Sequence, residues 1–275
     1  MSRPFFIVSS GRSGTAMLTK ALSQSPDVTI EHEYMVHLIQ PLGVRRYQGL
    51  ASPQEAETTL KATYGAALHY CQTPLWGDSS NKLSWLIPDL IKAFPQARFI
   101  HLVRDGRKVA GSYFHKLGAE NYDDRSSAIF ADYLRTPQSV QMPPPEKKYW
   151  WPQPLHGTPW AQAFAGFDQF ERIAWHWAEI NAVILGEMEK IAPAQRLFVR
   201  LEDLRASPST VKALYAFLGL PWQDSIFSIF QRPHNVNRPV DTPLTPDQAA
   251  RFSRIAGVMM ERLEYAGRDE YAVSY

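Results

Sequence analysis

The sequence of 275 residues has a single cysteine, Cys71, and no long apolar run. One cysteine excludes an intrachain disulfide and is typical of a reducing compartment, so we expect a cytoplasmic protein. The first apolar run, residues 5–8, is far too short for a signal-peptide core, and we expect no membrane span. The formal net charge is only +2, which does not indicate nucleic-acid binding. A basic pocket for a small anionic ligand remains compatible with this charge.

Short apolar runs alternate with helical patterns along the chain, as is typical of βαβ units. The length favours one α/β domain over residues 1–275 rather than two small ones. We expect a three-layer fold in which helices flank a central, mostly parallel sheet. The predicted strands are residues 5–9, 28–30, 75–77, 98–103 and 196–201. The predicted helices are residues 83–94, 106–115, 167–191, 207–217 and 245–263.

A run of small residues, Ser9-Ser10-Gly11-Arg12-Ser13-Gly14-Thr15, follows the first predicted strand. An amphipathic segment comes next, so the order is strand, tight loop and helix start, which directs backbone N–H groups at a phosphate. The loop of ATPases has lysine after its last glycine, whereas Thr15 follows Gly14 here. We therefore predict phosphate binding by residues 10–15, without metal-assisted ATP hydrolysis and without a metal site.

A second candidate phosphate site follows the predicted strand 98–103. Arg104-Asp105-Gly106-Arg107 lies where that strand ends, and Ser112 comes eight residues after Arg104 on the next predicted helix. Ligands of doubly wound folds bind at the carboxyl edge of the sheet, where Arg104 and Ser112 could hold one phosphate together. The alternative is that the two arginines are surface charges and that Ser112 packs against the sheet.

These motifs resemble those of the sulfotransferases that use 3′-phosphoadenosine 5′-phosphosulfate (PAPS). Gly11-Arg12-Ser13-Gly14-Thr15 is similar to the 5′-phosphosulfate loop of that family, and Arg104 with Ser112 is similar to its 3′-phosphate motif. Further similar segments are residues 94–100, 201–204 and 217–222, so the resemblance covers about half of the chain, in residues 5–33, 76–115 and 170–222. It implies a fold like that of P-loop NTPases, PAPS as donor and no required metal.

The resemblance also implies a general base that deprotonates an acceptor hydroxyl. Tyrosylprotein, carbohydrate and bacterial members use a Glu after the second strand, and Glu33, 21 residues after Arg12, fits best. Glu31 and His32 are the alternatives, and Glu31 and Glu33 could instead be solvated charges after a strand. A carboxylate at this position can act as a base if burial raises its pKa toward neutrality. Arg12 is expected to contact the sulfuryl oxygens and to stabilise their charge.

Two further segments have a functional and a structural interpretation. Relatives carry a Lys or Ser near the transferring group where this chain has Gly77-Asp78-Ser79-Ser80-Asn81-Lys82. Ser79 or Lys82 could serve there, although the start of a capped helix explains the segment equally well. Near the end of the chain, Arg238 resembles a late basic contact to the 3′-phosphate, and a polar turn explains it as well.

Residues 117–166 are rich in Pro, Tyr and Trp and show no clear periodicity. We expect this irregular insert to form the acceptor side, with Trp160 and residues 149–151 as an acceptor-binding wall. A small molecule or a carbohydrate is favoured over a protein as acceptor. The alternative functions are a small-molecule or nucleotide kinase on the same fold and a non-catalytic nucleotide-binding protein.

Overall fold

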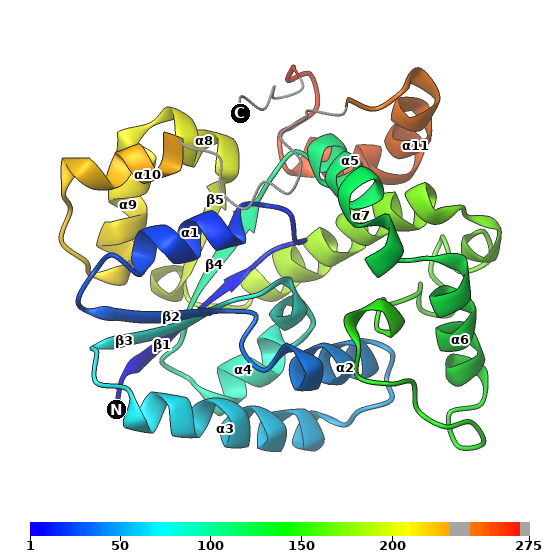
Figure 1. Ribbon diagram of the computed structural model, residues 1–275, viewed down its shortest axis with the longest axis horizontal. Coiled ribbons are helices and arrows are strands. Elements are labelled where there is room, and N and C mark those ends of the chain that lie inside the picture. The colour runs from blue at the N-terminus through cyan, green and yellow to red at the C-terminus, as the bar shows by residue number, and fades with distance from the viewer. Residues whose placement is uncertain (232–242, 270–275) are drawn as a thin grey trace.

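A five-stranded sheet forms the centre of the protein in a computed structural model that describes residues 1–231 and 243–269 (Figure 1). The strand order is β2-β3-β1-β4-β5 and every pairing is parallel. The strands are β1 (Arg3–Val8), β2 (Val28–His32), β3 (Leu75–Ser79), β4 (Arg98–Val103) and β5 (Arg196–Arg200). The predicted α/β class and parallel sheet are confirmed.

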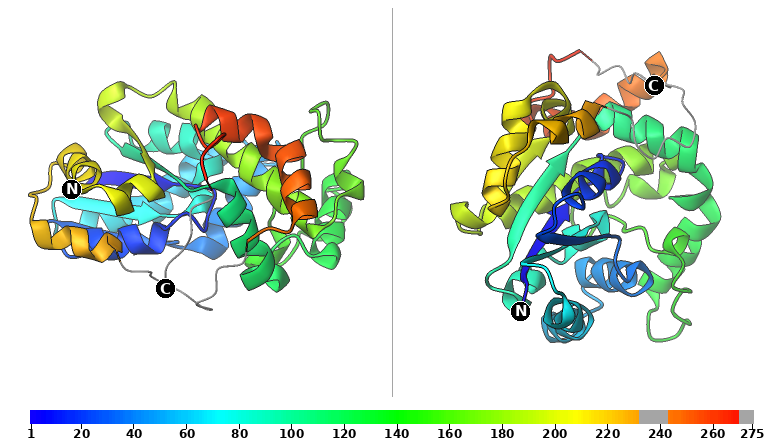
Figure 2. Two further views of the ribbon diagram at one scale, coloured as in Figure 1. Left: turned by 90° about the horizontal axis from the view of Figure 1, so that it is seen from above. Right: turned by 60° about the vertical axis from the view of Figure 1, so that its left-hand side comes forward.

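Helices cover both faces of the sheet, so that three layers result (Figure 1). On one face lie α1 (Thr15–Leu22), α8 (Leu201–Ala206), α9 (Pro208–Leu218) and α10 (Phe227–Gln231). On the other lie α2 (Val36–Tyr47), α3 (Pro53–Tyr70), the short 3₁₀ turn η1 (Asn81–Trp85), α4 (Ile87–Ala93) and the second half of α7 (Gln169–Met188). The right-hand view of Figure 2 shows α8–α10 and α2–α3 on opposite sides of the strands.

A third group of helices extends the layer of α7 past the end of the sheet. The first half of α7 packs with α5 (Gly106–Leu117) and α11 (Pro246–Arg262) around Val103. Both α7 and α11 begin with a capping box, formed by Asp168 with Glu171 and by Thr245 with Gln248. These caps satisfy N–H groups at the helix starts and fix where the helices begin.

The sequence of β1 shows why this strand is central. Its last four residues are fully buried, with Phe5 and Ile7 facing α1 and α9 while Phe6 and Val8 face α3 and α4. Side chains alternate between the two faces of a strand, so a strand covered on both faces needs apolar residues at consecutive positions. The short apolar run at residues 5–8 therefore marks the middle of the sheet.

The insert at residues 117–166 is more regular than its sequence suggests. It contains α6 (Asp124–Arg135), whose N-cap Asp123 accepts a hydrogen bond from Ser126 N, and the 3₁₀ turns η2 (Gly118–Glu120), η3 (Lys147–Tyr149) and η4 (Phe164–Gly166). Phe130 and Tyr133 of α6 pack against Trp150, which is 1% exposed. The insert lies beside α2, because Gln40 donates hydrogen bonds to Lys147 O and Trp150 O (Figure 1).

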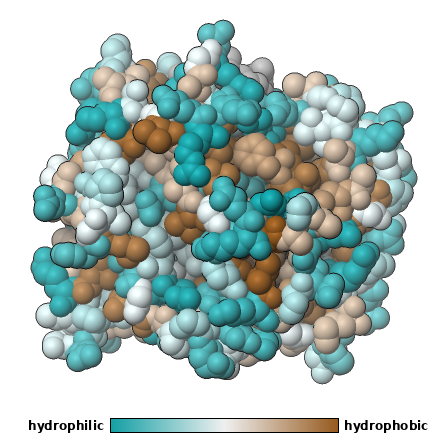
Figure 3. Space-filling model, turned by 180° about the vertical axis from the view of Figure 1, so that it is seen from behind, coloured by the Kyte–Doolittle hydropathy of each residue, from teal (hydrophilic) through white to brown (hydrophobic). Residues whose placement is uncertain are grey.

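The surface shows no single dominant apolar area on the side opposite to Figure 1. Apolar residues gather there in several areas with hydrophilic residues between them (Figure 3). Within residues 1–231 and 243–269, no helix combines the length and the apolar character that crossing a membrane requires.

Candidate functional site

The loops that follow the strands bring the predicted site residues to one edge of the sheet. Because all strands are parallel, their carboxyl ends meet at the same edge. Arg12 follows β1, Glu33 follows β2, and Lys82 lies just after β3. Arg104 follows β4, next to the start of α5. Residues that are up to about 90 positions apart in the sequence therefore share one site.

The loop between β1 and α1 depends on its two glycines. Gly11 and Gly14 have φ of 80° and 90°, in the left-handed region that favours glycine. A Cβ atom on Gly11 would lie 1.9 Å from Tyr113 Oη, and one on Gly14 would lie 2.6 Å from Leu201 Cδ1. Arg12 between them also has a positive φ, of 52°. The loop is thus folded tightly between α5 and α8, and larger residues at either glycine would disrupt it.

The serines of the loop shape its backbone. Ser9 Oγ accepts a hydrogen bond from Gly11 N at 3.1 Å, and Ser13 Oγ donates to Gly11 O at 3.0 Å. Ser10 Oγ lies 3.1 Å from Ser13 Oγ, and Ser84 Oγ donates to Ser9 O. Among the residues that the structure describes, no side chain caps the start of α1. Its first N–H groups therefore point toward the loop, as at known phosphate sites.

Arg12 joins the two predicted phosphate sites. Its Nε donates a hydrogen bond to Ser112 Oγ at 3.0 Å, and Arg104 Nη1 donates to Arg12 O at 2.9 Å. Ser112 is 9% exposed and Arg12 is half-buried. The structure therefore brings Arg12, Arg104 and Ser112 together, although the sequence placed Arg104 and Ser112 at a separate anion site. Arg238 lies outside the described residues.

Glu33 is held in a constrained turn at the end of β2. Its φ of 58° is unusual for a residue with a side chain, and such strain is found preferentially at functional sites. Glu33 N donates a hydrogen bond to Ser79 O at 3.2 Å, and the next amide, Tyr34 N, donates to Asp78 Oδ1 at 3.2 Å. Asp78 is fully buried and also accepts from Tyr64 Oη at 2.8 Å. The end of β3 thus fixes the backbone on both sides of the Glu33 side chain.

The charges around Glu33 differ from what the sequence suggested. Burial raises the pKa of Glu33, as expected, but Lys82 and Lys147 together outweigh it, so that the pKa is lowered. Lys147 Nζ donates a hydrogen bond to Glu33 Oε2. The condition of a raised pKa is therefore not met, because two cations favour the ionised carboxylate more strongly than burial disfavours it.

The two alternatives for the base, His32 and Glu31, lie within two residues of Glu33 in the chain but are more exposed than Glu33. His32 Nε2 lies 3.1 Å from Thr15 Oγ1, which connects the end of β2 to the start of α1. Burial lowers the pKa of His32, assisted by Lys147 and Arg12 and opposed by Glu33. Glu31 is exposed.

Lys82 lies beneath the same edge and is only 5% exposed. Its Nζ lies 4.3 Å from the centroid of the Trp151 ring, a favourable cation–π contact. Burial lowers the pKa of Lys82 to about 8, although Glu33 acts in the opposite direction. Ser80 Oγ accepts the hydrogen bond from Lys82 N that starts η1, as a capped start requires. The structural interpretation of this segment is thus correct, and Lys82 also faces Glu33.

The expected aromatic wall is mostly part of the core. Trp150 and Trp151 are 1% and 8% exposed, and their Nε1 atoms donate to Pro144 O and Glu120 O. Trp160 packs against Phe167, with 5.6 Å between the ring centroids. Of these rings, Trp151 contacts a site residue, because it lies over the amine of Lys82.

Three residues near the site were missed by sequence reasoning. Lys147 is carried by the insert, Asp78 is buried under Glu33, and Tyr113 Oη donates to Ser10 O at 3.2 Å. A signal existed for Tyr113, because it directly follows Ser112 on a predicted helix beside the loop. Asp78 could have been suspected as a carboxylate inside an apolar strand. Lys147 had no such signal.

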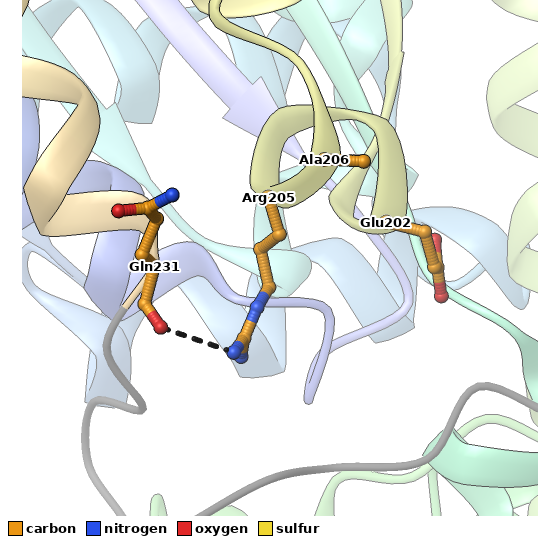
Figure 4. A pocket seen from close by; sticks show the side chains of 4 residues that line it. All are labelled: Glu202, Arg205, Ala206 and Gln231. Atoms are coloured by element: carbon orange, nitrogen blue, oxygen red, sulfur yellow. Dashed lines mark hydrogen bonds between the residues drawn. The ribbon is translucent and has the colours of Figure 1, made fainter.

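A hollow of about 260 Å³ lies beside the loop, on the side of α8. Glu202, Arg205, Ala206 and Gln231 line it (Figure 4). Arg205 Nη2 donates a hydrogen bond across it to Gln231 O at 3.3 Å. Glu202 accepts from Asp105 N and Tyr265 Oη, so that α8 is joined to the end of β4.

Metal-binding side chains do not gather in the described part of the chain. Within residues 1–231 and 243–269, no group of three or more His, Cys, Asp or Glu residues is arranged to hold a metal ion. The cations at the sheet edge, Arg12, Lys82, Lys147 and Arg104, are instead the groups that can attract an anion.

Comparison with known proteins agrees with this arrangement. Residues 4–137 match the model of the sulfotransferase family. Among curated proteins no sequence matches the chain. A solved sulfotransferase from Alicyclobacillus acidocaldarius is 18% identical with a TM-score of 0.56, and 98% of each chain is covered.

Two solved sulfotransferase domains show the same similarity. That of the olefin synthase of Synechococcus PCC 7002 is 16% identical with a TM-score of 0.53, covering 98% of this chain and 96% of the other. That of the curacin biosynthetic pathway is 15% identical with a TM-score of 0.51, covering 93% and 98%. At these identities the structural likeness establishes the fold. Residues 4–137, just under half of the chain, match the model of the sulfotransferase family, and the match and the fold together support a sulfotransferase.

Proposed function

We propose that the enzyme transfers a sulfuryl group from PAPS to the hydroxyl group of a small molecule or a carbohydrate, with Glu33 as general base. The observation that carries this proposal is the convergence of Arg12, Arg104, Ser112 and Glu33 at one edge of the sheet. PAPS has two phosphorylated positions, of which the loop would hold one, while Arg104 at the end of β4 and Ser112 of α5 would hold the other. When bound, the donor supplies an activated sulfuryl group whose leaving group is already a stabilised phosphate.

The residues of the chain fit the donor in three places. The uncapped start of α1 and the left-handed glycines offer N–H groups to the 5′-phosphosulfate. Arg104 and Ser112 would hold the 3′-phosphate. The hollow lies on α8, whose first residue, Leu201, is the neighbour of Gly14 in the loop, and we assign part of the nucleoside to it.

In the reaction, Glu33 would accept the proton of the acceptor hydroxyl while its oxygen attacks the sulfur. The lowered pKa keeps Glu33 ionised and ready to accept at neutral pH, at the expense of basicity. Arg12 and Lys82 would stabilise the charge on the sulfuryl oxygens. Fixed cations in a partly buried site stabilise such charge more effectively than water does. Positioning and charge stabilisation thus account for most of the catalysis.

Ligand binding tests this function directly. In thermal unfolding, 3′,5′-adenosine bisphosphate at about 100 times its dissociation constant should stabilise the protein by roughly 2.7 kcal/mol. ATP with Mg²⁺ is the control, since a kinase on the same fold would be stabilised by it. Stabilisation by ATP with Mg²⁺ and none by the bisphosphate would contradict the proposal. Sulfuryl transfer from radiolabelled PAPS to a panel of hydroxylated acceptors then identifies the acceptor class.

Deprotonation of Lys82 is expected to produce the basic limb of the profile of kcat/KM against pH. Its ammonium is charged below its pKa of about 8 and loses its charge above it, so kcat/KM should fall as the pH rises through 8. Lys82→Arg keeps a cation to much higher pH and should move this limb upward. Lys82→Met should lower kcat/KM at neutral pH and abolish the limb. A wild-type profile that stays flat to pH 9.5 or so would contradict this assignment.

A further inference from the structure

Lys147 reaches the site from the insert, and its position is fixed by the fold. Gln40 Nε2 on α2 donates hydrogen bonds to Lys147 O at 3.1 Å and to Trp150 O at 2.6 Å. Trp150 Nε1 in turn donates to Pro144 O at 2.7 Å, and its buried ring packs against α6. The backbone around Lys147 is therefore attached to α2 and to the core of the insert. The backbone is thus ordered by contacts other than the ion pair, and only the rotamer freedom of the Lys147 side chain is lost when the pair forms.

The partner of Lys147 is the proposed base. Lys147 Nζ donates to Glu33 Oε2, and the two side chains are 37% and 19% exposed. An ion pair at this depth is less screened than a surface pair, so it can influence the state of the carboxylate. The adjacent Lys148 is exposed and instead lies over the ring of Tyr149, at 4.9 Å from its centroid. The two neighbouring lysines therefore have different surroundings.

Several other titratable groups face Glu33 from the elements around it. They are Lys82 of η1, His32 of β2, Asp78 of β3 and Tyr113 of α5, and Arg12 of the loop acts on His32 and Tyr113. Burial opposes the ionised form of Glu33, while Lys82 and Lys147 favour it. Lys82 acts through its charge, whereas Lys147 acts through its charge and a hydrogen bond. Removing Lys147 would thus shift the balance toward the protonated form.

We propose that Lys147 is a positioning residue of the transfer reaction, which keeps the carboxylate of Glu33 ionised and oriented toward the acceptor. This inference rests on the proposed role of Glu33 as base. A carboxylate has about four acceptor positions, so Glu33 can receive the acceptor hydroxyl while the bond from Lys147 persists. The insert thereby contributes a part of the reaction machinery in addition to any contact with the acceptor.

The test compares Lys147→Met with Lys148→Met in the full-length enzyme. In Lys147→Met, the acid limb of the profile of kcat/KM against pH should move upward by about one pH unit, so that at pH values on the wild-type acid limb kcat/KM is lower than in the wild type by up to about 10-fold. Lys148→Met should keep the wild-type profile. Lys147→Arg should restore the acid limb, whereas Lys147→Gln, which keeps a donor but no charge, should restore it only in part. Coinciding profiles of the two methionine variants would overturn the inference.

A second measurement separates this inference from the proposed function. The ¹³C shift of the Glu33 carboxyl, assigned by comparison with Glu33→Gln, is titrated in the protein without substrates. The midpoint should be higher in Lys147→Met, or in Lys147→Gln if the former does not fold, than in Lys148→Met. Equal midpoints refute the effect of Lys147 on Glu33, whatever the enzyme transfers. A shifted midpoint in a protein that transfers no sulfuryl group would refute the proposed function instead.

Discussion

Glu33→Gln is expected to lower kcat by about 10²-fold or more while leaving the binding of 3′,5′-adenosine bisphosphate nearly unchanged. The amide keeps the size of the side chain but cannot accept the proton of the acceptor hydroxyl. The left-handed turn that presents the side chain is fixed by Ser79 O and Asp78, neither of which contacts the carboxylate in a way that the substitution removes. Single-turnover transfer from PAPS measures the loss at the chemical step, and thermal unfolding with the bisphosphate shows that the donor site is intact.

Glu31→Gln is the matched control for this variant. Glu31 lies two residues before Glu33 and is exposed, so its substitution should leave kcat within a factor of about two. Near-normal turnover in Glu33→Gln would move the base to His32 or Glu31. His32→Gln and Glu31→Gln then decide between them, since the true base is the one whose loss removes turnover. Turnover that survives all three substitutions would exclude a base at the end of β2.

The donor side of the site could be predicted because its signals are local. The apolar run at residues 5–8, the glycines at 11 and 14 and the amphipathic segment after them all lie within residues 5–22, and each reflects the backbone that the loop needs. The strand that ends at Arg104 is equally clear, since β4 is buried over its last five positions. A parallel sheet then brings both segments to one edge without further information.

The helices α2 and α3 show where local signals were overlooked or ambiguous. Ser52-Pro53 is the same kind of helix start as Ser207-Pro208 and Thr245-Pro246, and Ser52 Oγ indeed accepts from Glu55 N at 3.1 Å. The α2 helix contains Pro41 in its interior and begins after Met35 in a left-handed conformation, so its ends carry no usual cap. Packing of Ile39 and Leu42 into the core outweighs these weak local preferences.

The electrostatics of the base could not be predicted in the same way. Lys147 lies 114 positions from Glu33 in a segment without periodicity, and its approach depends on how the insert folds onto α2. Burial was the one influence on Glu33 that the sequence suggested, and by itself it would raise the pKa. The pKa of Glu33 is lowered instead because the tertiary structure brings two cations, Lys82 and Lys147, close to it, and no sequence pattern near Glu33 reveals them.

The structure also changes the interpretation of the loop of residues 9–15. As a sequence it is a phosphate loop without the lysine of the ATPases, and the arginine within it could have been an incidental surface charge. In the structure Arg12 is half-buried, its Nε is bound by Ser112, and its carbonyl is bound by Arg104. The fixed arginine places a positive charge within the loop, which suits the anionic donor proposed above.

Arg12→Ala is expected to reduce kcat/KM by about 10²-fold or more, because it removes the cation of the loop that would stabilise the sulfuryl oxygens. It should also weaken binding of 3′,5′-adenosine bisphosphate, seen as a smaller thermal stabilisation at equal ligand concentration. Arg12→Lys restores the charge but not the planar fork, so it should recover part of the rate, while Ser112→Ala tests the hydrogen bond that orients Arg12. If Arg12→Ala turned over normally, charge stabilisation would have to come from Lys82 and the start of α1. If Arg12→Lys were as impaired as Arg12→Ala, the bidentate geometry of the guanidinium, and not its charge, would be what the reaction requires.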